Sequence, residues 1–537
     1  MRDITGKEPT NRQKHLKIAE PAKAEPPNGG GAGGSDKEES KNTCQDNNNT
    51  SDKKEQAAKE PRQTQAVVML QIVFDRQLDF FHDNNKEPYA VIPVDNHREV
   101  YALNSREFKT WLNQTFHGET GKPISGEAIQ QTIAVLTGTA LFDRPEPIDL
   151  QTRIAKKDKS FYYDLCNPEW QAVEVTPGGW WVSSNPPELF TRYRHQQAQP
   201  TPPEHGEVTD LLQYINIKKG RTLFLVWLVS CFVPGIPHPL LVLYGEKGSA
   251  KTTASELLKA LIDPSSLDTL TIQKSTRAMA VNLLQHYYLP FDNVSFINEE
   301  TSDTLCRAIT GGGIQQRQLY TDSDDVIFTF KRAVSINGIN NVATRPDLLD
   351  RSILIELERL PDGERQEAAA IREAFEQDKP GILAGIFDAL SGAMKNYPFY
   401  HPKSLPRMAD FARWGYVIGE AIQGGLGDVF LREYAENRAT QNQEAIAADP
   451  VATLIVAFMQ GREEWEGSAT LLYKALKNVA GDNEIYIGNR YFPRDPARLS
   501  KRLKAIRSNL EAVGIVLDMN YRTATTRYIR ITHTPKE

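Results

Sequence analysis

The chain has 537 residues, with 63 Lys and Arg against 69 Asp and Glu and a formal net charge of −6. At about 150 residues per domain, this length is enough for three or four domains that each hold their own core. The composition, with 40% hydrophobic residues and only 4 Cys, excludes collagen-like, coiled-coil and disulfide-stapled proteins.

The cysteines and the apolar runs indicate where the protein works. Cys44, Cys166, Cys231 and Cys306 stand too far apart in the sequence to predict a structural zinc site or a disulfide framework. The longest apolar run, residues 223–233, is shorter than the roughly 20 residues that a bilayer span needs. The N-terminus is polar and does not resemble a secretion signal. We therefore expect a reduced, cytoplasmic protein without a membrane segment.

The first 65 residues contain no Phe, Tyr or Trp and are rich in Lys, Glu, Asn, Pro and Gly. They bury too little apolar surface to offset the entropy lost on ordering, so we expect a disordered tail over residues 1–65. Residues 66–200 follow as a small α+β domain of unknown role. It is predicted to contain a periodic segment from residue 66, a helix after the N-cap Ser105, and strands at 89–93, 100–103, 161–165 and 171–182. A proline-containing linker over residues 196–207 closes this domain.

Residues 208–360 alternate short apolar strands with helical stretches, which is typical of a mostly parallel α/β sheet. The predicted strands are 240–244, 269–272, 287–291, 333–336 and 353–355. Residues 361–450 form a helical region that is charged on one face. Residues 451–537 are predicted to form two helices, a basic helix over 496–513, and strands at 515–521 and 527–531.

The most informative segment is residues 240–262, where an apolar strand leads into a glycine-containing turn and then a helix. At such a turn, backbone N–H groups converge on phosphate oxygens, a lysine adds a point charge and a hydroxyl binds Mg²⁺. Lys251 and Thr252 are placed for the last two roles, so the segment predicts a site for ATP and Mg²⁺. The predicted cofactor-binding residues are Gly245, Glu246, Lys247, Gly248, Ser249, Ala250, Lys251, Thr252 and Thr253.

Ala250 stands where the P-loop pattern G-x-x-x-x-G-K-[ST] has its second glycine. A methyl group is tolerated at that position only if the residue keeps a negative φ angle. The alternative interpretation of the segment is an ordinary strand-to-helix turn with an exposed lysine.

The third predicted strand delivers a carboxylate, Asp292, to the edge of the sheet where the metal ion would lie. We therefore expect Asp292 to be catalytic and to help bind Mg²⁺; the alternative is a solvated residue at a strand end. Pro290 is unusual inside a central strand, and Asn293 occupies the place where many ATPases carry a catalytic glutamate. If a base activates the attacking water, Glu299 and Glu300 are the candidates.

Two further polar residues complete the predicted catalytic set. Asn337 ends the fourth strand, where its amide would orient the attacking water or contact the γ-phosphate, although Asn before Gly is also a frequent turn pair. Arg351 precedes the fifth strand, where an arginine can reach a phosphate on a neighbouring subunit and raise the rate by about 10³ to 10⁵. An ion pair with Asp347 or Asp350 is the alternative role for Arg351.

With these residues in line, the segment resembles the AAA+ class of P-loop ATPases. It is most similar to the group of superfamily-three helicases, phage and plasmid primase-helicases and minichromosome maintenance helicases. The run Gly-Glu-Lys-Gly-Ser-Ala-Lys-Thr is similar to the last of these in its Ala-Lys pair, and Leu-Leu-Asp-Arg351 is similar to the arginine-finger segment. Leu-Pro-Phe-Asp292-Asn resembles the metal-binding strand, and Asn337 falls where the sensor asparagine belongs. The likeness covers residues 208–360.

The resemblance implies a ring, usually a hexamer, with ATP held between subunits and a β-hairpin that grips single-stranded DNA in a central channel. Residues 317–332 show a hairpin pattern between the third and fourth strands. Its tip is acidic and would repel phosphates, because it carries Asp322, Asp324 and Asp325. The hairpin therefore either serves subunit packing or contacts DNA through its flanks, at Arg317, Lys331 and Arg332.

Residues 490–530 contain ten basic and three acidic residues. This is a concentrated positive charge in a chain of net charge −6. The order of a helix, a basic helix and a hairpin resembles a winged helix, in which the basic helix enters the major groove and the wing follows the backbone. A winged helix used for protein contacts is the alternative. The predicted DNA contacts are Arg498, Lys501, Arg502, Lys504 and, at the hairpin tip, Arg522.

The sequence thus predicts an α/β protein in which a P-loop AAA+ domain follows a small α+β domain and precedes a helical region and a winged helix. We expect an ATP-dependent, ring-forming DNA helicase or translocase of a phage or mobile-element replication system. It would act on single-stranded or forked DNA, with any primase supplied by a partner. One alternative is an ATP-switched DNA loader or remodeller that does not unwind DNA, which the acidic hairpin tip favours. Another is a DNA-binding regulator stabilised by nucleotide, which the missing second carboxylate favours.

Overall fold

The computed structural model describes residues 63–273, 275–317, 325–339, 345–361, 363, 366–482, 492–519 and 528–534. The chain from Gln63 onward forms one compact unit, within which three large hydrophobic cores can be distinguished. The predicted disordered tail lies outside the described residues, apart from its last three positions.

The first core belongs to an N-terminal α+β domain. Its elements are α1 (Gln65–Asp75), β1 (Asp79–His82), β2 (Pro88–Val94), β3 (His97–Ala102), α2 (Arg106–Thr120), α3 (Gly126–Gly138) and a π-helical turn (Thr139–Asp143). The three strands pair antiparallel in chain order. Ser105 caps α2 as predicted, because its hydroxyl accepts the N–H of Phe108 at 3.1 Å. The helices bury Phe108, Leu112 and Met69 against the sheet.

A second antiparallel sheet follows in the order β4-β5-β6-β7. Its strands are β4 (Ile154–Lys157), β5 (Ser160–Asp164), β6 (Ala172–Thr176) and β7 (Gly179–Ser183). Alternate side chains of this sheet, including Phe161, Val173 and Val175, enter the large central core. The sheet also bonds to α9 (Ala368–Asn396), since Trp180 Nε1 donates to Asp388 Oδ1 at 2.9 Å.

The centre of the molecule is a parallel sheet in the order β13-β8-β12-β9. Leu270 adds a single parallel bridge beside Phe291 of β9, at the place of the predicted second strand. The strands are β8 (Leu240–Tyr244), β9 (Tyr288–Phe291), β12 (Ala333–Gly338) and β13 (Ser352–Glu356). All are almost wholly buried, because helices cover both faces.

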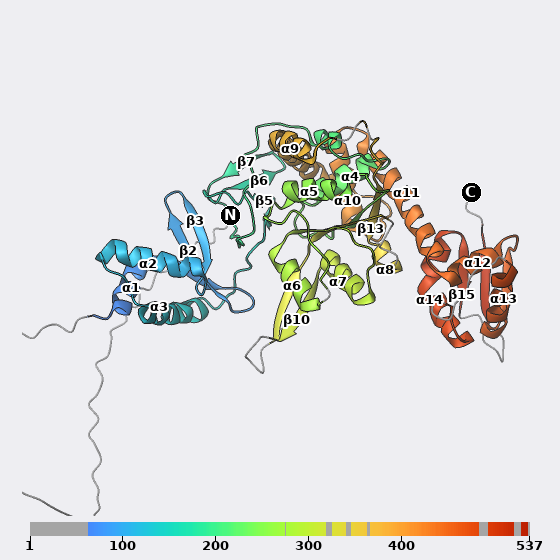
Figure 1. Cartoon of the computed structure of the whole chain (residues 1–537), viewed down its shortest axis with the longest axis horizontal. Helices are drawn as coiled ribbons and strands as arrows, with labels where there is room; N and C mark the ends of the chain where they lie inside the picture. The colour runs from blue at the N-terminus through green and yellow to red at the C-terminus, as the bar shows by residue number, and fades with distance from the viewer. Residues whose placement is uncertain are drawn as a thin grey trace, which may run out of the picture. The chain divides into compact units, whose positions relative to one another are not determined.

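The helices that cover the central sheet form two layers (Figure 1). In that view, α4, α5, α9 and α10 lie above the sheet, and α6, α7 and α8 lie below it. The helices are α4 (Arg221–Ser230), α5 (Lys251–Ile262), α6 (Thr276–Gln285), α7 (Glu299–Thr310), α8 (Pro346–Leu349), α10 (Ala409–Ile422) and α11 (Leu426–Ala447). Two short 3₁₀ helices, Val208–Gln213 and Tyr397–Phe399, join the same body.

The apolar run at residues 223–233 is a core helix. Every residue of α4 from Thr222 to Ser230 is buried, and the Trp227 indole donates to the carbonyl of Pro239 at 2.8 Å. In the described part of the chain, no helix has both the length and the apolar character that a bilayer crossing requires.

The hydrophobic cores divide the chain differently from the predicted domain boundaries. Strands β4 to β7 were grouped with the N-terminal domain up to residue 200, yet their inner face belongs to the core around the parallel sheet. Helices α9 to α11, predicted as a separate region over residues 361–450, also belong to that core. The reason is that each of these amphipathic elements can bury its apolar face only against a neighbour from another stretch of sequence.

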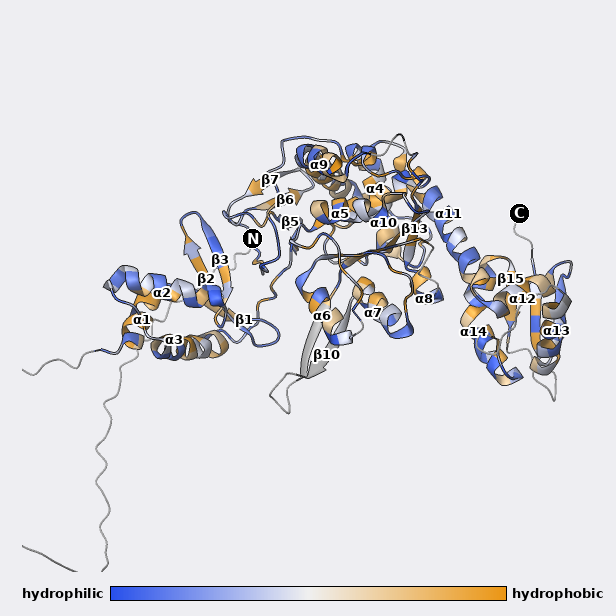
Figure 2. Ribbon diagram, in the orientation of Figure 1, coloured by the Kyte–Doolittle hydropathy of each residue, from blue (hydrophilic) through white to orange (hydrophobic). Residues whose placement is uncertain are grey.

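The third core belongs to a C-terminal domain. Its elements are α12 (Pro450–Met459), β14 (Glu464–Gly467), α13 (Ala469–Asp482), α14 (Pro496–Ala512), β15 (Ile515–Asp518) and β16 (Ile529–His533). The strands pair antiparallel in the order β14-β16-β15, and β14 was not predicted. Leu454 of α12, Leu476 of α13 and Leu503 of α14 are fully buried in this core, and Figure 2 colours parts of these helices as hydrophobic.

Candidate nucleotide site and nucleic-acid interface

The turn that joins β8 to α5 contains three residues with positive φ angles. These angles are 153° at Gly245, 86° at Gly248 and 56° at Ala250. A Cβ atom at position 245 would lie 2.4 Å from the carbonyl oxygen of Leu357, so only glycine fits there. The helix then begins at Lys251 without a side-chain N-cap, and its first N–H groups are the donors that an anion at a helix N-terminus would use.

The condition stated for Ala250, a negative φ angle, is not met. Ala250 adopts the left-handed conformation, with φ 56° and ψ 31°, which costs a non-glycine residue about 1–2 kcal/mol. The turn has only six residues in which to connect the strand to the helix. Closing so short a connection outweighs the steric cost at one methyl group.

The Lys251 ammonium folds back over the turn. Its Nζ donates to the carbonyl oxygens of Gly245 and Glu246, both at 2.8 Å, and to Ser249 Oγ at 3.2 Å. Partial burial lowers the pKa of Lys251, while the charge of Asp292 acts in the opposite direction. A bound phosphate would therefore replace neutral carbonyl oxygens with a full negative charge as the partner of this ammonium.

Thr252 and Asp292 lie together at the carboxyl ends of two parallel strands. The Thr252 hydroxyl donates to Asp292 Oδ1 at 3.0 Å, although 40 residues separate them in the chain. A hydroxyl and a carboxylate are hard oxygen ligands of the kind that Mg²⁺ prefers, so this pair fits the predicted ion.

Pro290 fits within β9 because its nitrogen, which carries no hydrogen, faces away from the neighbouring strand β12. Its carbonyl accepts the N–H of Leu270 at 2.8 Å, so the imide nitrogen faces the flank where Leu270 makes a single bridge. On the other flank, β9 pairs with β12 from Ala333 to Ile336. The proline therefore costs the central ladder nothing, and Asp292 is still delivered to the edge of the sheet.

Asn337 is the penultimate residue of β12 and is 2% exposed. Its Oδ1 accepts the N–H of Asn293 at 2.8 Å, and its Nδ2 donates to Ser255 Oγ at 2.8 Å. The amide thus ties the end of β9 to α5, and both of its polar atoms already have protein partners. Its predicted contact with water or the γ-phosphate stays a prediction.

The two glutamates considered as a catalytic base lie in the first turn of α7, and each has a partner. Glu299 Oε1 accepts from Arg345 Nη2 at 3.1 Å, and Glu300 accepts from the Thr276 hydroxyl. Asn293, at the usual place of the second carboxylate, has a φ angle of 52° and donates its N–H to Asn337.

Arg351 lies at the opposite end of the sheet from the turn. Its carbonyl accepts the N–H of Leu240, the first residue of β8, whereas the turn follows the last. Five residues of strand therefore separate Arg351 from the turn of its own chain, about 17 Å at 3.3 Å per residue. Arg351 forms an ion pair with Asp347, which also pairs with Arg407 at 3.1 Å.

Two of the three cations predicted on the hairpin flanks, Lys331 and Arg332, already have carbonyl partners. The hairpin pairs β10 (Gly312–Arg317) with β11 (Asp325–Phe330). Lys331 Nζ donates to the Gly235 carbonyl at 2.5 Å, and Arg332 Nε donates to the Leu283 carbonyl at 2.7 Å. Arg332 thereby satisfies the C-terminal end of α6, so its guanidinium has a structural role. The tip residues Asp322 and Asp324, and the side chains of Arg317 and Asp325, lie outside the described parts.

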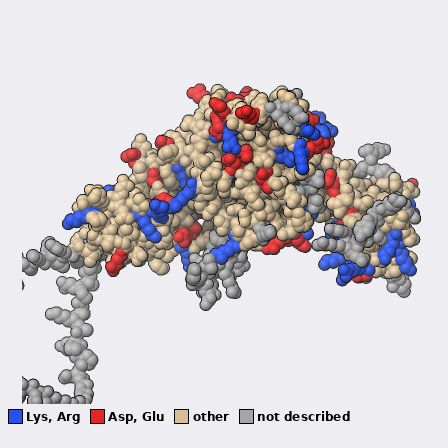
Figure 3. All heavy atoms as spheres, in the orientation of Figure 1, with Lys and Arg blue, Asp and Glu red and all other residues tan. Residues whose placement is uncertain are grey.

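The exposed face of α14 is basic, and Figure 3 shows Lys and Arg atoms gathered there. Arg498 pairs with Asp495 at 3.4 Å, and Arg502 pairs with Asp449, whose side chain is only 3% exposed. Lys501 and Lys504 are exposed on the same helix. Arg522 lies outside the described residues.

Two family models match the chain. Residues 208–426 match the replication protein of actinomycete integrative conjugative elements, and residues 451–537 match the C-terminal domain of RepA of these elements. Together the matches span more than half of the chain. This is a RepA-type replication protein of a mobile element.

No curated protein matches this RepA-type chain. Among solved structures, the apo structure of the NrS-1 C terminal region (305-718) is similar with a TM-score of 0.36 and 13% identity, covering 88% of this chain and 100% of that one. The A form apo structure of the same region gives a TM-score of 0.37 and 13% identity, covering 87% and 98%.

The two RepA matches correspond only partly to the hydrophobic cores. The C-terminal match, 451–537, coincides with the third core. The first match begins at residue 208, although strands β4 to β7 upstream of it contribute to the same central core.

Sequence reasoning missed Ser255, which holds the Asn337 amide, and Arg407, which shares Asp347 with Arg351. Ser255 lies one helical turn beyond Lys251, but serine at that spacing is common and carries no signal. Arg407 lies 56 residues beyond Arg351, and only tertiary packing brings the two to one carboxylate.

Proposed function

We propose that this replication protein is an ATP-hydrolysing motor that translocates on, or unwinds, single-stranded or forked DNA. The observation that carries the proposal is the Thr252–Asp292 hydrogen bond, which places a hydroxyl and a carboxylate beside Lys251 at one edge of the parallel sheet. That edge, outside the carboxyl ends of the strands, is where open α/β sheets bind ligands.

The residues of the turn have separable roles in this proposal. The N–H groups at the start of α5 and the Lys251 ammonium bind the phosphates, and Thr252 and Asp292 hold Mg²⁺. When bound, the metal ion neutralises charge on the phosphates. Asn337 keeps Asp292 in register with α5, because its amide joins Asn293 to Ser255.

The site of one chain is incomplete in this proposal. Glu299 and Glu300 are already engaged, and Arg351 lies at the far end of the sheet from its own turn. A second chain that brings its Arg351 to the phosphates would complete the site. We therefore propose that the protein works as a homo-oligomer, a ring of six chains, with a primase as a candidate partner.

The test is ATP turnover with and without single-stranded DNA. We expect DNA to stimulate turnover in the wild type, and Lys251→Ala to abolish it. Lys219→Ala, which removes an exposed lysine outside the turn, is the matched control and should keep full turnover. Turnover that ignores DNA would argue against a motor.

Two other functions are favoured by specific features. Asn293, in place of a second carboxylate, favours a DNA-binding regulator in which nucleotide only stabilises the oligomer. The acidic residues of the hairpin favour a loader or remodeller that grips DNA without unwinding it. Strand displacement on a forked duplex separates a helicase from a loader, and DNA binding without hydrolysis would support the regulator.

A further inference from the structure

The segment between α9 and α10, residues 397–407, is here named the aromatic loop. Its sequence is Tyr-Pro-Phe-Tyr-His-Pro-Lys-Ser-Leu-Pro-Arg, with no acidic residue. Phe399 is 82% exposed, and no large apolar side chain in the described part of the chain is more exposed. Leu405 adds a second exposed apolar side chain, at 44%.

Stacked rings fix the chain on both sides of Phe399. On one side of it Tyr397 stacks on Trp414 with ring centroids 4.1 Å apart, and on the other Tyr400 stacks on Tyr416 at 4.0 Å. Arg413 donates to the carbonyl oxygens of both tyrosines. An exposed ring with a fixed base loses little conformational entropy on binding, which is the property of a preorganised contact.

The aromatic loop is continuous with the surface around Arg351. Its last residue, Arg407, pairs with Asp347 and Asp350, and Asp347 is also the ion-pair partner of Arg351. A macromolecule that reaches Arg351 must therefore approach next to the aromatic loop.

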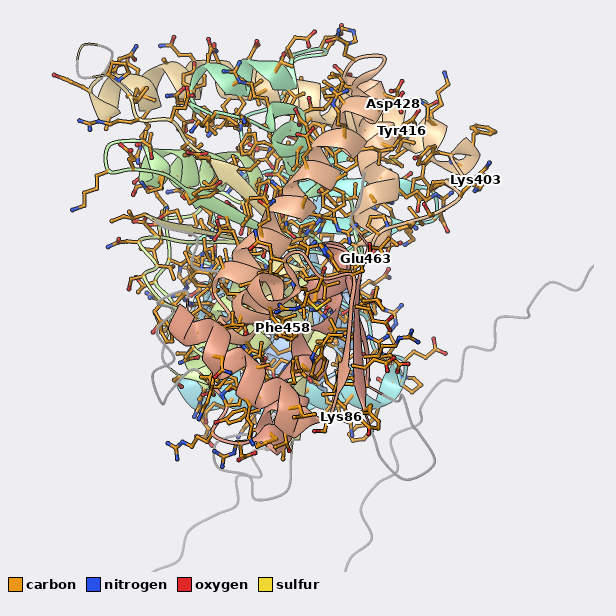
Figure 4. The ribbon with its side chains drawn as sticks, turned by 90° about the vertical axis from the view of Figure 1, so that its right-hand side faces the viewer. Lys86, Lys403, Tyr416, Asp428, Phe458 and Glu463 are labelled. Carbon is orange, nitrogen blue, oxygen red and sulfur yellow. The ribbon has the colours of Figure 1, made fainter. Side chains whose placement is uncertain are left out.

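The exposed apolar side chains of the loop favour a protein partner over DNA. Lys403 and His401 are exposed, but carboxylates flank the stacked tyrosines: burial and then Asp428 and Glu420 raise the pKa of Tyr416. Tyr416 and Asp428 lie close together, as Figure 4 shows. Leu405 offers a base no ring to stack on, so the loop presents one exposed ring rather than the series of rings on which successive bases stack.

A complementary surface exists elsewhere on the chain, directly after Asp292. Phe296 in the loop that leads to α7 is 75% exposed, and the first turns of α7 carry Glu299, Glu300 and Asp303 at the surface. This β9–α7 segment, residues 293–303, offers one exposed ring and several carboxylates. The aromatic loop offers one exposed ring and cations.

We propose that the aromatic loop docks on the β9–α7 segment of a second copy of this chain. The inference rests on the proposed function, since it assumes that Arg351 acts on the nucleotide of that second copy. Phe399 packs on Phe296, and Lys403 faces the carboxylates of α7. Because two different surfaces meet, the contact is head-to-tail and repeats from copy to copy until a ring closes.

The first test is the mass of the full chain by sedimentation, with ATP and Mg²⁺ present. We expect wild type to sediment as a multi-chain species, and both Phe399→Asp and Phe296→Asp to sediment as single chains of 60.4 kDa. Phe142→Asp is the matched control, because Phe142 is 81% exposed in the N-terminal domain. It should assemble like wild type.

The second test mixes the two defective variants. Phe399→Asp keeps an intact β9–α7 segment and Phe296→Asp keeps an intact aromatic loop, so the mixture should form a two-chain species and nothing larger. A pair of Phe399 surfaces meeting about a two-fold axis predicts instead that Phe296→Asp assembles normally and that mixing rescues nothing. That result would overturn the head-to-tail proposal.

The remaining outcomes separate this inference from the proposed function. A wild-type chain that stays single with nucleotide bound, or a Phe399→Asp variant that assembles normally, would overturn the docking proposal and leave ATP hydrolysis standing. Loss of single-stranded DNA binding in Phe399→Asp with assembly intact would assign the loop to DNA and also overturn it. If the variants assemble in the predicted pattern but the chain does not bind nucleotide, the docking proposal would stand and the proposed ATP-driven motor would be wrong.

Discussion

At the scale of single residues, the most informative position is Ala250, the only non-glycine residue with a positive φ angle in the turn between β8 and α5. Ala250→Gly should raise the free energy of unfolding by about 1 kcal/mol, because glycine adopts the left-handed conformation without the steric cost of a methyl group. The thermal unfolding midpoint of the full chain is the measurement.

The control for this substitution is Ala435→Gly. Ala435 is exposed in the interior of α11, where glycine costs about 1 kcal/mol relative to alanine. The two alanine-to-glycine changes should therefore move the unfolding midpoint in opposite directions. A decrease for both would contradict the strain assigned to Ala250.

The candidate site could be predicted from sequence where its chemistry is local. Lys251 and Thr252 follow a strand and a turn in the chain, and Asp292 ends a strand, so the pattern alone indicated that they meet. The sign of the Ala250 φ angle was not predictable from sterics at one residue, because closure of the whole turn decides it. The partners of Asn337 and Arg351 come from distant segments that no local pattern reveals.

At the scale of elements, α14 divides its cations into two kinds. Lys501 and Lys504 are exposed, whereas Arg502 holds Asp449, the N-cap of α12. Replacing Lys501 and Lys504 together with alanine should weaken binding to all DNA sequences alike. It should also reduce the slope of log K against log salt by about 2, close to one for each phosphate that is no longer neutralised. Binding measured over a range of salt concentrations tests this.

Two matched variants accompany that experiment. Lys474→Ala with Lys477→Ala removes two exposed lysines from α13 and should leave the salt slope unchanged. Arg502→Ala should instead lower the unfolding midpoint of the C-terminal domain, since it strips a buried carboxylate of its cation. If Arg502→Ala changed only DNA affinity, the structural role given to it would be wrong.

The loop before β8 contains a buried histidine that should make stability depend on pH. His238 is 2% exposed, and burial, followed by the charge of Lys331, lowers its pKa to about 3. In the unfolded chain the pKa returns to about 6.5, so the unfolded state binds more protons below that value. Stability is therefore lost as the pH falls from about 6.5 toward 3, by about 1.4 kcal/mol per pH unit.

The measurement is the free energy of unfolding between pH 6.5 and 4. In His238→Gln, the loss of stability with falling pH should be shallower than in wild type by about 1.4 kcal/mol per pH unit. His205→Gln, at a histidine whose side chain is 86% exposed, is the control and should keep the wild-type slope. Equal slopes in all three proteins would contradict the assignment.

The predictability of the elements followed their length and periodicity. Helix α14 and the buried strands β8, β12 and β13 lie at nearly the predicted positions, whereas α9, α10 and α11 were predicted only as one helical region over residues 361–450. The strands β1, β4 and β14, each four residues long, were missed because four residues are too few to show a clear alternation of apolar and polar side chains. These short strands form because they pair with β2, β5 and β16, and a strand's own four residues do not reveal its partner.

At the scale of the whole molecule, a buried ionic cluster ties β4 to the nucleotide-site body. Arg153 donates to Asp263 Oδ1 at 3.0 Å, and Lys259 of α5 donates to Asp263 Oδ2 at 2.8 Å, with all three side chains at most 1% exposed. Burial alone would raise the pKa of Asp263, but Lys259 and Arg153 hold it well below its ordinary value. Such a cluster stabilises the fold only while every member is present.

This arrangement predicts where the chain can be cut. A fragment that starts at residue 150 keeps the cluster and the sheet β4 to β7, whereas a fragment that starts at residue 208, where the RepA match begins, loses both. The shorter fragment exposes the apolar surfaces that packed against Phe161, Val173 and Val175, each worth about 1.5–3 kcal/mol. It also leaves Asp263 without Arg153, although Lys259 remains.

We therefore expect the fragment from residue 150 to unfold cooperatively near the midpoint of the full chain. The fragment from residue 208 should bind a hydrophobic dye strongly and unfold at a much lower temperature, or fail to fold. Calorimetry and dye fluorescence on the two fragments provide the measurement. Equal midpoints would mean that the sheet β4 to β7 is an accessory to the nucleotide-site body, and that the buried Arg153–Asp263 pair adds no stability to it.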